Sequence, residues 1–282
     1  MGISDEIKKH FDKWCEAHKS DVEYDWSETG VAKESFTIDG VIDEGIWNQQ
    51  SKKVLYILRE ANGNSSKETD HGRVVDENRF WFKECVESGT LGNIIFKRIA
   101  KMQAIIQADN ALEYRDLLQQ IAYMNLNKRG GGSSVDWKVL NKYVNAYKKY
   151  IRDEIRMLQP DVIVCCGTYW TLIDDVLDLY KPNGEKQWES GDERDLRINT
   201  EIDGHECTII NMYHPSSRMS DDNYLNRFNS IYPCAQNTNI VDNGYELTKE
   251  KIIQYINDLE ENSEAFYDLC DFIINIKVNR EK

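Results

Sequence analysis

Lys53-Val54-Leu55-Tyr56-Ile57-Leu58 is a nearly continuous apolar run, and the polar residues Arg59-Glu60-Ala61-Asn62-Gly63-Asn64 follow it directly. A short run of this kind is typical of a strand buried on both faces, as in a parallel sheet. Three other short runs have the same character. The sequence therefore predicts four strands, near residues 54–59, 121–126, 161–166 and 207–213.

Helical patterns separate these runs, among them a long amphipathic segment over 136–158. Strands that alternate with helices predict an α/β fold with three layers, α/β/α, around a central four-stranded parallel sheet. Helical patterns also precede and follow this core. We expect an N-terminal helix and acidic extension packed on the core, an α/β domain and a C-terminal helical extension, at 1–50, 51–240 and 241–282.

Charge is distributed unevenly along the 282 residues, whose formal net charge is −14. Residues 1–50 carry 12 acidic and 5 basic side chains, whereas residues 123–160 carry 8 basic and 3 acidic ones. Overall charge alone therefore does not indicate a nucleic-acid partner, but the basic middle segment is compatible with one.

The cysteines and the apolar runs limit the class of protein. None of the 7 cysteines forms a C-x-x-C pair, so we expect no metal or iron–sulfur centre. No apolar run approaches the length of a membrane span, and residues 1–20 do not resemble a signal peptide. The expected location is the cytoplasm, with no membrane partner.

Polar clusters follow each of the four predicted strands. Because the carboxyl ends of parallel strands meet at one edge of the sheet, these clusters are expected to lie together and to form the ligand site. The sequence contains no G-x-G-x-x-G, no phosphate-binding P-loop and no G-x-S-x-G nucleophile turn. The clusters are Glu60–Gly63, Asn125–Ser134, Gly167–Thr168 and His214–Arg218.

The order of these motifs resembles the uracil-DNA glycosylase superfamily over about residues 51–230. Residues 54–63 resemble its first motif, a buried strand followed by G-E-A-P-G or G-x-N-P-G, with Arg59 and Asn62 in place of Gly and Pro. Residues 122–129 resemble the T-N-x-x-K-x-R segment of its iron–sulfur members, and residues 159–167 resemble their P-x-x-I-x-x-x-G strand. Tyr213-His214-Pro215-Ser216-Ser217 resembles the final H-P-S-P motif. The cluster cysteines of those members are missing.

The resemblance implies a monofunctional DNA glycosylase that needs no metal or cofactor. Its substrate would be a uracil-like base, or a modified base such as a modified cytosine of phage DNA, flipped out of single- or double-stranded DNA. Breaking the bond between base and sugar leaves positive charge on the sugar and negative charge on the base. A carboxylate that orients water suits the sugar side, and fixed hydrogen-bond donors suit the base side.

These requirements give each candidate residue a role. The catalytic candidates are Glu60, Asn62 as a water-positioning partner, and His214 for the departing base. Asn125 is expected to read the base edge, and Phe80 or Trp81 to stack on the base, although these aromatics and Phe82 fit a core equally well. Trp47, Trp137 and Trp170 are expected in the core or between helices. The candidates for DNA contacts are Lys128, Arg129, Ser216, Ser217 and Arg218.

Two other functions remain open. One is a non-catalytic protein of the same fold that binds a nucleic acid or a nucleotide. The other is hydrolysis of a free nucleoside or nucleotide, which suits the acidic net charge. Catalysis requires Glu60 to face the same cleft as Asn125 and His214. The oligomeric state is not predicted.

Overall fold

The structure is a computed structural model, and it describes residues 2–21, 35–62, 67–69, 72–74, 80–109, 111–131, 135–179, 186, 190–191 and 196–232. The predicted C-terminal extension at 241–282 and much of the polar stretch after Asn62 lie outside the described residues.

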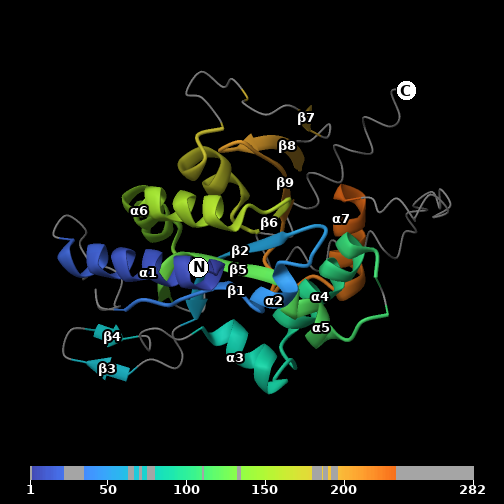
Figure 1. The fold of residues 1–282 in the computed structure, drawn as a ribbon, viewed down its shortest axis with the longest axis horizontal. Helices are drawn as coiled ribbons and strands as arrows, with labels where there is room; N and C mark the ends of the chain where they lie inside the picture. The colour runs from blue at the N-terminus through green and yellow to red at the C-terminus, as the bar shows by residue number, and fades with distance from the viewer. Residues whose placement is uncertain are drawn as a thin grey trace, which may run out of the picture. The chain divides into compact units, whose positions relative to one another are not determined.

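A mixed sheet of seven strands, in the order β1-β5-β2-β6-β9-β8-β7, forms the centre of this part of the chain (Figure 1). The four predicted runs are its parallel centre: β5 (Ile121–Gly131), β2 (Val54–Asn62), β6 (Val162–Cys166) and β9 (His205–Met212). Three antiparallel strands extend it: β1 (Gly40–Val41), β8 (Arg197–Ile202) and β7 (Ser190–Gly191). A second sheet pairs β3 (Lys67–Thr69) with β4 (Gly72–Val74).

The α/β class is confirmed, and the predicted sheet of four strands is too small. β1 and β7 have two residues each, too few to leave a sequence pattern. β8 alternates buried residues with exposed or half-buried ones, so it lacks the continuous apolar run that marks the central strands.

Helices cover both faces of the sheet (Figure 1). In β2, Leu55 and Ile57 face one helical layer, whereas Val54, Tyr56 and Leu58 face the other, so both faces require apolar residues. We call these the first and second layers; a short helix, α2 (Glu44–Trp47), precedes β2. The first layer contains α1 (Ile3–Ser20), α6 (Trp137–Leu158) and the π-helix Thr171–Val176, and the second contains α3 (Trp81–Ser88), α4 (Ile94–Gln107), α5 (Tyr114–Gln119) and α7 (Asp221–Ile231).

Strands β2 and β5 continue beyond their apolar parts. Leu58 pairs with Asn125 and Glu60 with Asn127, and a bulge separates these pairs from the last one, between the backbones of Asn62 and Gly131. Both strands therefore run beyond the predicted bounds of 54–59 and 121–126. Polar side chains suggested loops there, but the two strands satisfy each other's backbone hydrogen-bonding groups.

A buried ionic cluster fixes β5 to the first layer. The Lys128 Nζ atom lies 2.5 Å from the Asp39 Oδ1 atom and 3.0 Å from the Glu154 Oε2 atom of α6. Burial and then the charge of Asp39 raise the pKa of Glu154, which favours the protonated form of this carboxyl group.

Lys128 cannot contact DNA as predicted, because its side chain has no exposed surface. Its ammonium group lies 5.0 Å from the ring centroid of Phe11 and 5.2 Å from that of Trp14, both on α1. The DNA contact predicted for Arg129 is wrong for the same reason, since only 1% of this residue is exposed. Lys128 and Arg129 were predicted to contact DNA because the residues that bury them are distant in sequence.

None of the helices in the described ranges combines the length and the apolar character that a membrane span requires.

The Lys128→Met variant is expected to lower the free energy of unfolding by about 3–5 kcal/mol, because it leaves Asp39 as a buried charge without its cation. Urea unfolding measures this difference. The control is Lys138→Met, an exposed residue on α6, which should change stability by about 0.5 kcal/mol or less. A Lys128→Met protein as stable as the unmodified one would contradict the structural role.

Candidate active site

Glu60 lies near the carboxyl end of β2 and faces the second layer, as Leu58 does. Burial raises the pKa of its carboxyl group to about 7, against a smaller opposing effect of a hydrogen bond from the Asn127 side chain and the charge of Arg59. At neutral pH the carboxyl group is therefore divided between its two protonation states. A general base works best with a pKa near the operating pH.

Asn127 holds this carboxylate in place and was not identified from the sequence. Its Oδ1 atom accepts a hydrogen bond of 2.9 Å from the backbone N–H of Arg129, so its Nδ2 group is the donor to Glu60. A possible signal was the alternation of Asn125 and Asn127, which puts both amides on one face of β5.

Asn125 is buried on the same face, two residues before Asn127, which is the partner of Glu60 in the strand register. Its backbone N–H donates to the Asp39 Oδ2 atom at 2.7 Å, and its Oδ1 atom accepts from the Tyr123 hydroxyl at 3.3 Å. Phe82 stacks on Tyr123 with ring centroids 4.3 Å apart. This support orients the amide, and Nδ2 is the group of Asn125 left to contact a ligand.

His214 follows β9 and is neutral in this setting. Its Nδ1 atom accepts a 3.2 Å hydrogen bond from the Ser216 backbone N–H, which can only donate, and lies 2.7 Å from the Ser216 hydroxyl. The proton of the neutral ring is therefore on Nε2. Burial and then the charge of Arg59 lower the pKa of His214 to about 4. The ring thus presents one N–H donor without a positive charge.

Arg98 of α4 fixes the loop that carries His214, and this residue was also missed. Its Nη1 group donates to the carbonyl oxygens of Pro215 and Ser217, each at 2.9 Å, and its Nη2 group donates to the carbonyl oxygen of Met219. Its Nε group pairs with Asp221 at 2.9 Å. Arg98 is buried, so these contacts set the conformation of the loop.

Arg59 connects three strand ends. Its Nε group donates to the Gly167 carbonyl oxygen after β6 at 3.3 Å, and its guanidinium lies 4.7 Å from the ring centroid of Trp137. Its charge also lowers the pKa values of Glu60 and His214. Gly167 has φ +74°, a backbone conformation that favours glycine, and a Cβ atom there would lie 2.8 Å from an Arg59 nitrogen and displace the guanidinium.

The remaining predicted residues differ in their surroundings. Ser216 and Arg218 are exposed, whereas Ser217 is half-buried and its hydroxyl accepts from Arg98. Their contacts with DNA stay predictions. The side chain of Asn62 lies outside the described residues, so its role also stays a prediction.

The predicted base-stacking residues border the second layer. Phe80 and Trp81 are half-buried against it, and the Trp81 ring lies 5.2 Å from that of Phe96. Phe82 is a core residue beneath Tyr123. Stacking of a base on Phe80 or Trp81 stays a prediction.

The prediction that Trp137 and Trp170 lie in the core or between helices is wrong. They are 45% and 51% exposed, whereas Trp47 is fully buried as expected. Trp137 begins α6, and Trp170 follows β6 and Gly167, so both lie at the edge of the sheet that carries Glu60. Helical spacing cannot distinguish an exposed first residue of a helix from a buried one.

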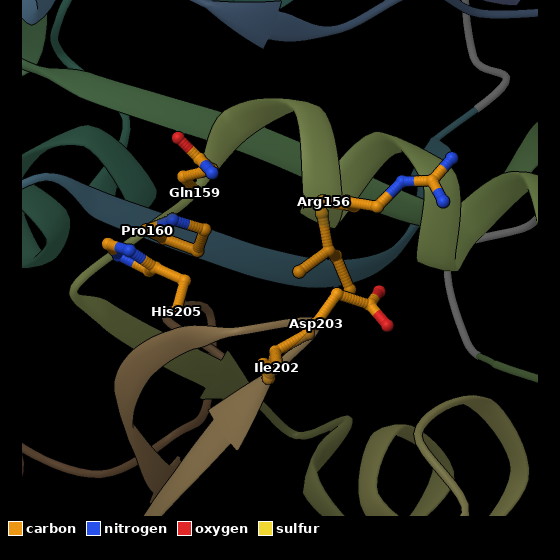
Figure 2. A pocket seen from close by; sticks show the side chains of 7 residues that line it. Arg156, Gln159, Pro160, Ile202, Asp203 and His205 are labelled. Atoms are coloured by element: carbon orange, nitrogen blue, oxygen red, sulfur yellow. The ribbon is translucent and has the colours of Figure 1, made fainter.

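Two hollows lie at the opposite edge of the sheet, near the amino ends of the parallel strands. Figure 2 shows the smaller one, of about 10 Å³, between the end of α6 and the turn from β8 to β9, with Gln159, Pro160 and His205 in its wall. The other has a volume of about 540 Å³ and is lined by residues such as Asp161 and Thr208. Neither includes Glu60, Asn125 or His214. Ligands of parallel sheets bind at the carboxyl edge, so the candidate site lies there.

Within the described ranges, no three His, Cys, Asp or Glu side chains are grouped so that they could hold a metal ion. Burial raises the pKa values of the Cys165 and Cys166 thiols, which are packing groups of the two cores.

No protein-family model matches the chain, and no curated protein matches its sequence significantly.

Glu60→Gln is expected to become more stable relative to the unmodified protein as pH rises. The folded state raises the pKa of Glu60 from its ordinary 4.5 to about 7, so the native protein loses stability as pH increases between these values. Glutamine does not titrate, and the difference in free energy of unfolding should grow by about 2 kcal/mol between about pH 5 and pH 8.

Urea unfolding across this pH range measures the difference. The exposed Glu113 supplies the matched control, because Glu113→Gln makes the same substitution at a position outside the candidate site. A Glu60→Gln difference that does not vary with pH would show that Glu60 titrates normally.

Proposed function

We propose that the protein is a monofunctional DNA glycosylase that hydrolyses the bond between deoxyribose and a uracil-like or modified base flipped out of DNA. The observation that carries the proposal is Glu60, a carboxyl group with a pKa of about 7, held by an asparagine at the carboxyl edge of a parallel sheet. The ordered motifs that resemble the uracil-DNA glycosylase superfamily support the same function. Modified cytosines of phage DNA fall within the proposed substrate range.

Glu60 would act on the sugar side of the reaction. When the bond from C1′ to the base nitrogen breaks, its electron pair leaves with the base and the sugar becomes positively charged. The ionised Glu60 stabilises that charge and removes a proton from the water that attacks C1′. Asn127 keeps the carboxylate in position through its side-chain hydrogen bond. Asn62 remains the candidate for a second contact to this water.

His214 and Asn125 would act on the base. The departing base becomes an anion, and the Nε2–H group of a neutral His214 donates a hydrogen bond to it. Because the pKa of His214 is about 4, its ring is neutral near pH 7 and stabilises the anion by donating a hydrogen bond, without transferring a proton. Asn125 Nδ2 is a second donor and suits a base with a carbonyl oxygen at its edge. These two groups and Glu60 divide the roles on the two sides of the bond.

Hydrolysis of a free nucleoside or nucleotide is the second candidate. The burial of Lys128 and Arg129 favours it, because two predicted contacts to the DNA backbone are lost. The same Glu60 and His214 chemistry would apply to both substrates.

Incubation with defined substrates tests the proposal. The panel contains single and double strands with uracil, hydroxymethylcytosine or its glucosylated form, together with the free nucleosides, and abasic sites or released bases are measured. An abasic site in DNA supports the glycosylase. Release only from free nucleosides would establish the second candidate, and no release from any substrate would favour a non-catalytic binding protein.

Glu60→Gln should reduce the rate on a confirmed substrate by about 10²–10⁴-fold and leave binding nearly unchanged, because the carboxylate acts on the transition state. His214→Ala should reduce the rate by about 10²–10³-fold. The native rate should rise with pH to a plateau above about pH 7, as Glu60 ionises. Single-turnover rates measured between pH 5 and pH 9 check both expectations.

The exposed Glu84 on α3 supplies a matched control, and Glu84→Gln should retain the native rate and pH profile. Asn125→Asp should change which base is accepted rather than remove activity on all of them. Full activity of Glu60→Gln would exclude Glu60 as the base.

A further inference from the structure

Two exposed tryptophans border the candidate active site. Among the described residues, Tyr114, Trp137 and Trp170 are the large hydrophobic side chains with at least 36% of their surface exposed. Trp137 and Trp170 both lie at the carboxyl edge of the sheet, where Glu60 and His214 are. Single exposed apolar side chains are ordinary on protein surfaces, so the informative feature is that both tryptophans lie at the edge that carries the candidate site.

Contacts of Arg59 and Thr171 join the two segments that carry the tryptophans. Arg59 places its guanidinium 4.7 Å from the Trp137 ring centroid and donates to the Gly167 carbonyl oxygen, three residues before Trp170. The Thr171 hydroxyl, next to Trp170, donates to the Asn141 side chain of α6 at 3.4 Å, one turn after Trp137. We call Trp137, Trp170 and Arg59 the aromatic rim.

Basic and acidic side chains both surround the rim, since Asp136 and Asp174 are exposed near the two tryptophans, and the basic ones are the groups that a nucleic acid would contact. Arg59 lies against the Trp137 ring, and Lys138 and Lys142 are exposed on the first two turns of α6. Tryptophan rings beside basic side chains are the combination that binds single strands, in which each unpaired base offers a flat face for stacking. In a duplex the bases are stacked on each other and do not offer these faces.

We propose that the aromatic rim stacks the unpaired bases that flank the reacting nucleotide, so that the substrate is single-stranded DNA. This inference rests on the proposed function for the nature of the nucleic acid. It assigns Trp137 and Trp170 to the bases beside the cleft, and Arg59 to holding the Trp137 ring while it carries positive charge toward the strand. Glu60 and His214 remain the groups that act on the flipped nucleotide.

The test measures binding of the full chain to a fluorescently labelled mixed-sequence oligonucleotide, as a single strand and as a duplex. Trp137→Ala and Trp170→Ala should each weaken single-strand binding by about 5–100-fold, the range expected for the loss of one stacked base. Duplex binding should change by less. Trp137→Phe and Trp170→Phe keep an aromatic face and should recover most of the affinity.

Tyr114→Ala is the matched control, because Tyr114 is exposed on α5 in the second layer and should not affect binding. Quenching of tryptophan fluorescence by the single strand gives a second measurement, and it should decrease in both alanine variants. Alanine variants that bind the single strand as tightly as the native protein would overturn the proposal. Equal losses for single strand and duplex, or no binding of either, would also overturn it.

The outcomes separate this inference from the proposed function. Loss of single-strand affinity in the alanine variants, without excision of any base by the native protein, would support the rim and refute the glycosylase. Base excision together with unchanged binding by the variants would refute the rim alone. Self-association that both alanine variants abolish, without binding of the oligonucleotide, would make the rim an interface between copies of the chain and refute the inference.

Discussion

The candidate site depends on the parallel register of β2 against β5. That register places Glu60 opposite Asn127 and two residues beyond Leu58, the partner of Asn125, so Glu60 and both amides lie on a single face of the sheet. A shift of one residue would turn Glu60 toward the first layer and separate it from both amides. The apolar side chains on both faces of β2 oppose such a shift, because it would exchange the packing of two cores. Asp39 adds a second constraint, since its carboxylate contacts both Lys128 and the backbone of Asn125.

The environment of the site shifts the pKa values of Glu60 and His214 in opposite directions. Burial raises the pKa of Glu60 and lowers that of His214, and in each case it disfavours the charged form. Arg59 opposes this effect on Glu60 and strengthens it on His214. Near neutral pH the result is a carboxyl group ready to exchange a proton and an imidazole that donates without charge. Two environments that separate the pKa values of neighbouring groups are a recurrent way to divide acid–base roles in an active site.

The sequence predicted the parallel centre of the sheet because buried strands leave continuous apolar runs. It did not predict the polar ends of β2 and β5, since Arg59 and Lys128 resemble loop residues until their partners are known. Lys128 pairs with Asp39 and lies 3.0 Å from Glu154, and both are distant in sequence, so its burial could not be inferred locally. Glu60, Asn125 and His214 were identifiable as polar residues after strands. Arg98 was not, because it acts through the carbonyl oxygens of a remote loop.

The most direct test of the central claim is a crystal structure of the Glu60→Gln protein bound to single-stranded DNA. The DNA contains an intact base that the native protein excises. The account predicts a flipped base with its edge against Asn125 and the His214 Nε2 atom, and with the sugar C1′ facing residue 60. A flipped base lying away from these three residues, or DNA bound at the amino ends of the parallel strands, would contradict it.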